Sequence, residues 1–248
     1  MKSVLNTLAL LELIAAHQPV SLGELCGWVD QPKSSVQRAL STLKDAGWIK
    51  PADVEGKPRW VLSNRFLSLT GSNHLVTRLS QLAKPALIQL RDNCNETVFL
   101  STFDYDHMTV IDCIDSTHAV RLVGAVGGSI PAFMSSTGKA CLARLPEDHF
   151  TKILKGKTNR IPQGIAQLKR EIDDIRQQGY AIIRGEWSQE LTHIGAAIVD
   201  ARGHPIGGIG IAIPNHRQHE VFNDVLIKQV VEACEDISRS LASESACR

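Results

Sequence analysis

Residues 21–62 read SLGELCGWVDQPKSSVQRALSTLKDAGWIKPADVEGKPRWVL. The residues that begin and end helices and strands in this stretch predict a winged helix-turn-helix. Ser21 can cap a short helix over 22–29, because its hydroxyl can accept a free N–H of the first turn, and Glu24 stands at the capping-box spacing. Pro32 suits the first position of the next helix, which Gly47 ends because glycine readily takes the left-handed conformation. The wing is expected as two short strands, Trp48–Lys50 and Arg59–Leu62, joined by a tip over Pro51–Pro58.

The second of these helices separates an apolar stripe from a polar face. Val36, Ala39, Leu40 and Leu43 fall at i, i+3, i+4 and i+7, which predicts one buried side. The opposite side carries hydrogen-bonding and positive groups suited to the major groove of double-stranded DNA, while a wing can contact phosphate. The candidate DNA-binding residues are Lys33, Ser34, Ser35, Gln37, Arg38, Ser41 and Lys44 on the helix, with Lys57 and Arg59 on the wing. The alternative is a helix-turn-helix that serves only protein contact.

Length and charge suggest two domains and a need for more than one copy. A chain of 248 residues is long for a single domain and can bury a real core. Its formal charge is +1; residues 1–65 carry eight Lys or Arg and six Asp or Glu, against nineteen and twenty in the remainder. So small a positive excess implies that tight DNA binding needs two modules or specific contacts.

The composition favours a cytoplasmic protein. No apolar stretch approaches the length that a bilayer requires, so no membrane partner is expected. The apolar run near the N-terminus is interrupted by Glu12 and lacks a cleavage-like site, unlike a signal peptide. The six cysteines form no CxxC pair, which favours reduced, mostly buried thiols.

The rest of the chain predicts a linker followed by a mixed domain. Residues 1–16 form an expected helix that is apolar on nearly every side, which suggests contact with a partner subunit. Residues 64–95 look helical, interrupted at Gly71 and Ser72 and bent near Pro85, with a leucine-rich face suited to dimerisation. The expected domains are a winged helix-turn-helix over 1–64, a linker helix over 65–94 and a ligand-binding domain over 95–248.

Beyond residue 96 the pattern predicts an α+β domain with an antiparallel sheet flanked by helices. Hairpin-linked strands and inserted helices alternate there without internal repeats. The expected strands are 97–104, 108–115, 120–126, 180–183, 192–200 and 206–213. The expected helices are 136–145, 147–155, 165–178 and 222–241.

Taken together, these segments resemble the IclR family of bacterial transcriptional regulators over nearly the whole chain. The resemblance rests on QPKSSVQRALSTLKDAGWI (31–49), NETVFLSTFD (95–104), GGSIPAFMSSTGKACLARLPED (127–148), RQQGYAI (176–182) and HIGAAIVDARGHPIGGIGIAIP (193–214). It implies a winged helix, a linker helix and a GAF-like effector domain. It also implies a homodimer or dimer of dimers that binds operator DNA and a small organic acid to control catabolic genes, as a repressor in preference to an activator.

Three positions depart from the family pattern. Asn6 stands where relatives often carry an arginine early in the first helix, so a phosphate contact is missing there. Ile183 and Arg184 replace an acidic residue that relatives often have. Gly210 and Ala212 stand where a relative has serines on the last strand. The effector pocket is therefore expected to be less polar than that of a glyoxylate or pyruvate sensor.

The start of the helix at 136–145 is the best candidate for the effector site. Hydroxyls and free backbone N–H groups at the positive end of a helix suit a carboxylate, although simple helix capping would explain the same residues. Nearby apolar residues and small residues on the last strand suggest room for an aromatic ring. His193 either contacts the effector or is a structural histidine. The candidate effector-binding residues are Phe133, Met134, Ser136, Thr137, Gly138, Trp187, His193, Gly210 and Ala212.

Catalysis, metal and cofactor binding find little support in the sequence. His216 and His219 have a spacing that a metal could use, but no Cys or carboxylate completes a ligand set. Cys141 has no base nearby in sequence, and the GGIGIA run does not lead from a strand into a helix as a dinucleotide fingerprint would. We therefore expect a ligand-responsive regulator without a cofactor; the alternative is a small-molecule-binding or enzymatic protein whose helix-turn-helix serves only assembly.

Overall fold

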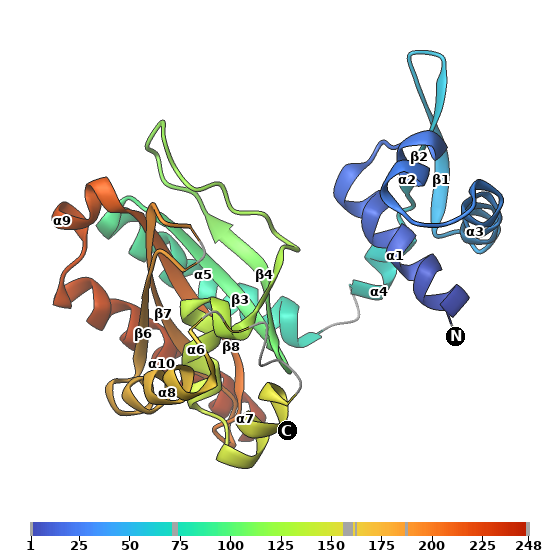
Figure 1. The fold of residues 1–248 in the computed structure, drawn as a ribbon. Helices are drawn as coiled ribbons and strands as arrows, with labels where there is room; N and C mark the ends of the chain where they lie inside the picture. The colour runs from blue at the N-terminus through green and yellow to red at the C-terminus, as the bar shows by residue number, and fades with distance from the viewer. Residues whose placement is uncertain (1, 71–73, 156–160, 162, 187, 247–248) are drawn as a thin grey trace. The chain divides into compact units, whose positions relative to one another are not determined.

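The chain divides into two compact units, residues 1–74 and 75–248 (Figure 1). The computed structural model describes residues 2–70, 74–155, 161, 163–186 and 188–246. The stretch 65–94, expected as one linker element, is shared between the units, and the predicted interruption at Gly71 and Ser72 lies outside the described residues. None of the described helices is both long and apolar enough to cross a membrane.

The first unit has a helix-turn-helix followed by a two-stranded wing. Its elements are α1 (Lys2–His17), α2 (Leu22–Trp28), α3 (Lys33–Asp45), β1 (Ile49–Val54), β2 (Lys57–Leu62) and α4 (Arg65–Thr70). The predicted capping box is confirmed, because the Ser21 hydroxyl accepts from the Glu24 N–H at 3.2 Å and Glu24 Oε2 accepts from the Ser21 N–H at 2.7 Å. Gly47 takes a φ of 78°, the left-handed conformation expected beyond α3. A single core joins the buried faces of α1, α2, α3 and β1.

The wing strands are longer than predicted. β1 and β2 pair from Ile49 opposite Leu62 to Val54 opposite Lys57, and a tight turn closes them. The expected tip over Pro51–Pro58 was too long: both prolines lie within the strands, because both strands of a two-stranded ribbon are edge strands, where the missing proline N–H breaks no interior ladder.

The second unit is a six-stranded antiparallel sheet with helices on both faces (Figure 1). Along the sheet the order is β5-β4-β3-β8-β7-β6. The strands are β3 (Thr97–Asp104), β4 (His107–Ile114), β5 (Ser129–Pro131), β6 (Tyr180–Arg184), β7 (Leu191–Val199) and β8 (Pro205–Pro214). The helices are α5 (His74–Cys94), α6 (Ser136–Ala143), α7 (Glu147–Leu154), α8 (Ile165–Gln178), α9 (Gln218–Val221) and α10 (Asp224–Ala246), with short 3₁₀ turns η1 (Ala132–Met134) and η3 (Asn215–Arg217).

Alternation along the central strands separates two cores. Ile194 on β7 and Ile209 and Ile211 on β8 pack with buried residues of α5 and α10. The side chains that alternate with these isoleucines along β7 and β8 point to the other face of the sheet, where α6, α7 and α8 build a second core. His193 and Gly195 therefore lie on the face that α6 covers.

Two expectations for this unit need correction. Residues 120–126 form no strand; they belong to an irregular segment in which Val120, Val123 and Val126 are exposed. These valines are spaced by three, whereas a half-buried strand needs a spacing of two. The leucine-rich face of α5 is also less available for dimerisation than expected, because Leu79 and Leu87 are buried against the sheet.

Candidate functional site

The face of α3 opposite its buried stripe is open to solvent. Val36, Leu40 and Leu43 are buried in the core of the first unit. Of the candidate DNA-binding residues on α3, Ser35 is half-buried, and the following are exposed: Lys33, Ser34, Gln37, Arg38, Ser41 and Lys44. These side chains can therefore reach base edges and phosphates in a major groove.

The two wing candidates differ in accessibility. Lys57 is exposed beside the turn of the wing. Arg59 is half-buried, and its Nη1 lies 2.8 Å from Glu24 Oε2 and donates to the Pro19 carbonyl at 3.1 Å. The assignment of Arg59 to DNA stays a prediction: its guanidinium ties the wing to α2, and a phosphate would have to compete with the Glu24 carboxylate.

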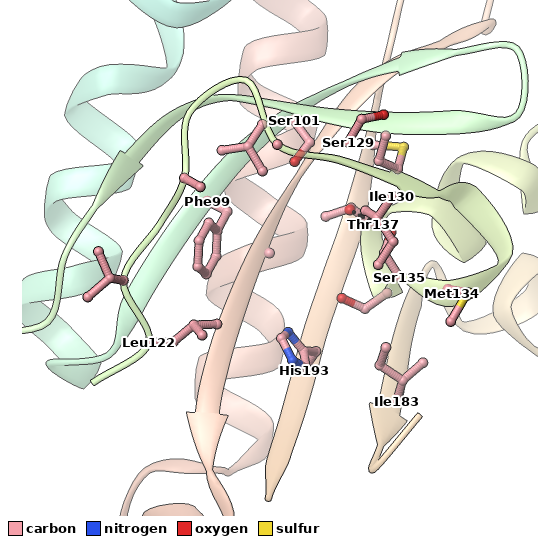
Figure 2. Close-up of a pocket in the computed structure, with 17 residues that line it drawn as sticks. Phe99, Ser101, Leu122, Ser129, Ile130, Met134, Ser135, Thr137, Ile183 and His193 are labelled. Carbon is pink, nitrogen blue, oxygen red and sulfur yellow. Dashed lines mark hydrogen bonds between the residues drawn. The ribbon is translucent and has the colours of Figure 1, made fainter. Parts of the chain in front are cut away.

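A cavity of about 250 Å³ lies on the α6 side of the sheet in the second unit (Figure 2). Strands β3, β4, β7 and β8, the start of α6 and the irregular segment before β5 enclose it. It contains five of the predicted effector residues, which are Met134, Ser136, Thr137, His193 and Gly210. The other lining residues are Phe99, Ser101, Met108, Val110, Leu122, Val123, Ala125, Gly128, Ser129, Ile130, Ser135 and Ile183.

Glycines bring the start of α6 directly onto the sheet. A Cβ on Gly195 would lie 2.5 Å from the Thr137 N, and one on Gly210 would lie 3.0 Å from Thr137 Cγ2. Ser135 caps the helix, since its Oγ accepts from the Gly138 N–H at 2.9 Å. Ser135 therefore both caps α6 and lines the cavity, whereas Ser136 and Thr137 line the cavity without capping the helix.

The remaining predicted effector residues do not line the cavity. Phe133 is 2% exposed and packs into the core that α6, α7 and α8 build on this face of the sheet. Gly138 is buried against the Ala132 backbone, where any side chain would clash. Ala212 is buried on β8 beside His193 and is not among the residues that line the cavity. Trp187 lies outside the described residues. The ring space expected at Gly210 is largely taken by the Thr137 methyl group.

Most of the missed lining residues come from β3, β4 and the irregular segment. Phe99 and Ser101 alternate with the buried Val98 and Leu100, so the sequence signalled that they share a face. It did not signal which face α6 would cover. Leu122 was assigned to a strand; instead its carbonyl accepts from Thr97 Oγ1 at 2.7 Å, which holds the irregular segment over the sheet.

His193 is the titratable side chain on the described wall of the cavity. Its Nε2 is buried and has no hydrogen-bond partner among the described residues. Burial lowers the pKa of His193 from 6.5 to about 4, so the ring is neutral at pH 7. No Lys, Arg, Asp or Glu stands among the described lining residues. The cavity is thus largely apolar, with hydroxyls at the start of α6 and on Ser101 and Ser129 of the sheet, and one neutral imidazole.

A buried lysine anchors α6 from its far side. Lys139 is 1% exposed, and its Nζ lies 2.8 Å from Glu171 Oε2 on α8 and 2.7 Å from Glu186 Oε1 in the turn after β6. We call these three residues the Lys139 cluster. Because an unpaired buried ammonium is costly, the cluster fixes α6 against α8 and that turn.

The described residues form neither a metal site nor a reactive thiol at Cys141. No three His, Cys, Asp or Glu side chains of the described chain gather as a metal site; His216 Nε2 instead lies 3.0 Å from Arg217 Nη1. Burial raises the pKa of the Cys141 thiol, which donates to the Gly207 carbonyl at 3.1 Å. A thiol held in this way is a packing group and not a nucleophile.

Comparison with known proteins identifies both units. Residues 3–52 match the IclR helix-turn-helix domain, and residues 74–239 match the family described as bacterial transcriptional regulator IclR C-terminal. The chain is 31% identical over 225 residues to the transcriptional repressor IclR of Escherichia coli, covering 87% of this chain and 81% of that protein. It is 28% identical over 246 residues to the acetate operon repressor of Salmonella typhimurium, covering 96% and 89%.

A solved structure shares the fold over nearly its whole length. It is an IclR homologue from Microbacterium hydrocarbonoxydans in complex with 4-hydroxybenzoate, with a TM-score of 0.77, 19% identity, and coverage of 96% of this chain and 98% of that one. The matches in sequence and fold agree with the exposed recognition helix of the first unit. The chain belongs to the IclR family of bacterial transcriptional regulators, and it is a regulator with a DNA-binding helix-turn-helix rather than an enzyme.

Proposed function

We propose that this regulator represses transcription by holding operator DNA with α3 and the wing, and that a small carboxylic acid in the cavity of the second unit changes its affinity for that DNA. The observation that carries the proposal is the exposed polar face of α3 opposite the buried Val36, Leu40 and Leu43. Repression is favoured because the two sequence relatives described above are repressors. Such a protein would act in the cytoplasm, where the operator lies.

Within α3, Arg38 and Gln37 are the proposed readers of bases. Both are exposed on the polar face, and their side chains can form paired hydrogen bonds with guanine and adenine respectively. Lys33, Lys44 and Lys57 are exposed and suit phosphate contacts, which position the protein without reading sequence.

The acid is proposed to bind with its carboxylate at the start of α6. Ser136 and Thr137 offer hydroxyls there, and the first turn of a helix carries a partial positive charge. The apolar wall would cover the remainder of the molecule. A ring-shaped acid is favoured over a short-chain acid because the wall is mostly apolar and because a protein of the same fold holds 4-hydroxybenzoate.

A homodimer is the proposed minimal DNA-binding unit, with a dimer of dimers as the larger assembly. The exposed apolar side chains Val4, Leu5 and Leu8 on α1 suit a subunit contact. Two copies would bind a pseudo-palindromic operator, and an effector would act by changing the spacing of the two winged helices. Light scattering should give at least a dimer at micromolar concentration; a monomer with and without DNA would contradict this.

The DNA contacts can be tested by fluorescence anisotropy with labelled DNA from upstream of the gene. Arg38→Ala should weaken binding by about 1–3 kcal/mol and leave the circular dichroism spectrum unchanged. Arg202→Ala, which removes the same charge from the exposed turn between β7 and β8, is the matched control and should bind like wild type. Equal affinities for all three proteins would refute the assignment of α3.

The effector site can be tested with a double variant that keeps the volume of the wall. Ser136→Ala with Thr137→Val removes two hydroxyls from the cavity wall. The double variant should still bind operator DNA, but the carboxylic acid that changes the operator affinity of wild type should no longer change it. The thermal stabilisation that a bound acid confers by linkage should disappear as well. A double variant that binds the acid as tightly as wild type in calorimetry would show that the carboxylate lies elsewhere.

A further inference from the structure

We propose that Glu24 is a positioning residue for DNA binding: its carboxylate holds one nitrogen of the Arg59 guanidinium, so that the remaining edge of the guanidinium faces a phosphate of the operator backbone. The inference rests on the proposed function, because it concerns how the wing meets the DNA that α3 reads. It goes further by giving an acidic residue, which would ordinarily repel DNA, a supporting role in binding it.

The first step is the way in which the Glu24 carboxylate is itself fixed. Its Oε2 accepts from the N–H of Ser21 at 2.7 Å and from the Ser21 hydroxyl, also at 2.7 Å. Both bonds come from the residue that caps α2, and with the bond from Arg59 they lower the pKa of Glu24 from 4.5 to about 2. The carboxylate is therefore charged and held in one place near pH 7.

The second step is that Glu24 occupies only one nitrogen of Arg59. Nη1 lies 2.8 Å from Glu24 Oε2 and 3.2 Å from Oε1, and it also donates to the Pro19 carbonyl at 3.1 Å. None of the described residues accepts a hydrogen bond from Nε or Nη2 of Arg59. Neither nitrogen is among the buried, unpaired side-chain atoms of the described chain, so both reach solvent. A phosphate therefore competes with Glu24 for Nη1 alone.

The third step is the chemistry of the remaining edge. In a planar guanidinium, Nε–H and one N–H of Nη2 point the same way and match two oxygens of a carboxylate or phosphate. The chain shows this paired contact elsewhere: Arg217 donates from Nε to Glu96 Oε1 at 2.5 Å and from Nη2 to Glu96 Oε2 at 2.8 Å. In Arg59 the same edge is left over after Nη1 has bound Glu24, so it offers a paired contact to an anion from outside.

The fourth step is the position of Arg59 within the helix-turn-helix. Through Glu24 the guanidinium is held at the first turn of α2, which is the first helix of that motif. In proteins that bind DNA with a helix-turn-helix, this first helix crosses the sugar-phosphate backbone. The remaining edge of Arg59 therefore lies near the part of the motif that meets phosphates.

The charge around Arg59 suits the same ligand. Residues directly opposite each other in an antiparallel ribbon share a face, and along one strand the faces alternate. Lys57 and Arg59 therefore lie on one face of the wing, and so does Lys50, which pairs with Val61. Asp53 is an odd number of residues from Lys50 along β1 and lies on the other face. Arg59 thus shares its face with two further cations and with no acidic side chain of β1 or β2.

The test is a salt series of fluorescence anisotropy titrations of the full chain with labelled DNA from upstream of the gene. Glu24→Gln removes the charge but keeps the capping box, because glutamine also serves at that position. It should weaken binding roughly three- to tenfold for each bound subunit, the range expected for one hydrogen bond. Arg59→Ala should weaken binding at least as much and should lower the slope of log affinity against log salt concentration by about one per subunit.

Two comparisons separate positioning from repulsion and from a structural role. Glu55→Gln removes the same charge from the exposed turn of the wing and should leave affinity unchanged or raise it, because an acid near DNA ordinarily repels phosphate. In a protein that already carries Arg59→Ala, Glu24→Gln should weaken binding no further. A role in folding alone would weaken binding to the same extent with or without Arg59.

Three results would overturn the inference: unchanged or tighter binding by Glu24→Gln, equal weakening by Glu24→Gln with and without Arg59, and an Arg59→Ala protein that binds like wild type. Each can occur while Arg38→Ala still weakens binding, so the inference can fail without the proposed function. Should Glu24→Gln fail to fold, nitrogen NMR of wild type decides: DNA should slow the exchange of the Arg59 Nε–H with water, and an unchanged rate would contradict the inference.

Discussion

Replacing Gly195 with alanine tests whether the cavity depends on α6 lying directly on the sheet. The new Cβ would stand 2.5 Å from the Thr137 N and 2.7 Å from the Ser136 carbonyl carbon, whereas ordinary contacts lie between 3.4 and 4 Å. The first turn of α6 must therefore move by about 1 Å. It cannot do so freely, because every residue of α6 is buried and the Lys139 cluster holds the helix on its other side.

The expected cost follows from these contacts. One extra methyl group forced into a close-packed interior costs about 1–3 kcal/mol, and backbone neighbours that cannot rotate away place this site in the upper half of the range. For a unit of residues 75–248, about 2 kcal/mol lowers the melting temperature by roughly 4–8 °C. The shifted helix should also weaken binding of a carboxylic acid, since Ser136 and Thr137 move with it.

Differential scanning calorimetry with two further glycine variants makes the test specific. Gly210→Ala would place its Cβ 3.0 Å from the Thr137 methyl group and 3.4 Å from the Ile194 carbonyl oxygen, and it should cost less than Gly195→Ala. Gly27→Ala in α2 meets no atom within 4 Å and should leave stability unchanged or raise it by up to about 1 kcal/mol, as alanine favours helix. A Gly195→Ala protein that melts and binds acid like wild type would refute the packing argument.

Two more predictions concern charged groups outside the cavity. Hydrogen bonds from Ser21, and the neighbouring Arg59, lower the pKa of Glu24 from 4.5 to about 2. Glu24 therefore adds stability to the first unit above pH 4.5 that is lost as the pH falls towards 2, and Glu24→Gln should flatten that acid limb in urea titrations; an unaltered limb would count against it. Lys139→Met leaves two carboxylates without their cation and should destabilise the second unit by about 3 kcal/mol, partly restored by adding Glu186→Gln. No recovery in the double variant would show that lost packing, and not charge, is responsible.

Features encoded within a few residues could be predicted from the sequence. The capping box at Ser21 and Glu24 forms as expected, and α8 runs over the predicted 165–178 and ends at a left-handed Gly179. Both depend on hydrogen bonds or conformations inside one turn of chain. The buried stripe of α3 was predictable for a related reason, because a period of 3.6 residues fixes which side chains share a face.

Features that depend on contacts between residues far apart in the sequence could not be predicted. Phe133 and Met134 are adjacent and both apolar, yet one enters the core and the other lines the cavity. The choice depends on how η1 approaches the sheet, which no local pattern records. Likewise Arg59 looked free on the wing, but the ribbon brings it to Glu24, 35 residues earlier in the chain.

The small residues on β7 and β8 show why the cavity itself was partly misplaced. A glycine in a strand indicates that something approaches the backbone closely, but the approaching group can be a ligand or the protein's own chain. At Gly195 and Gly210 it is the first turn of α6. The cavity lies instead between residues 122–130 and the sheet, where Phe99 and Ser101 line it. A ligand that bridges α6 and this segment would fix one against the other, so we expect the proposed effector to act most directly on this segment.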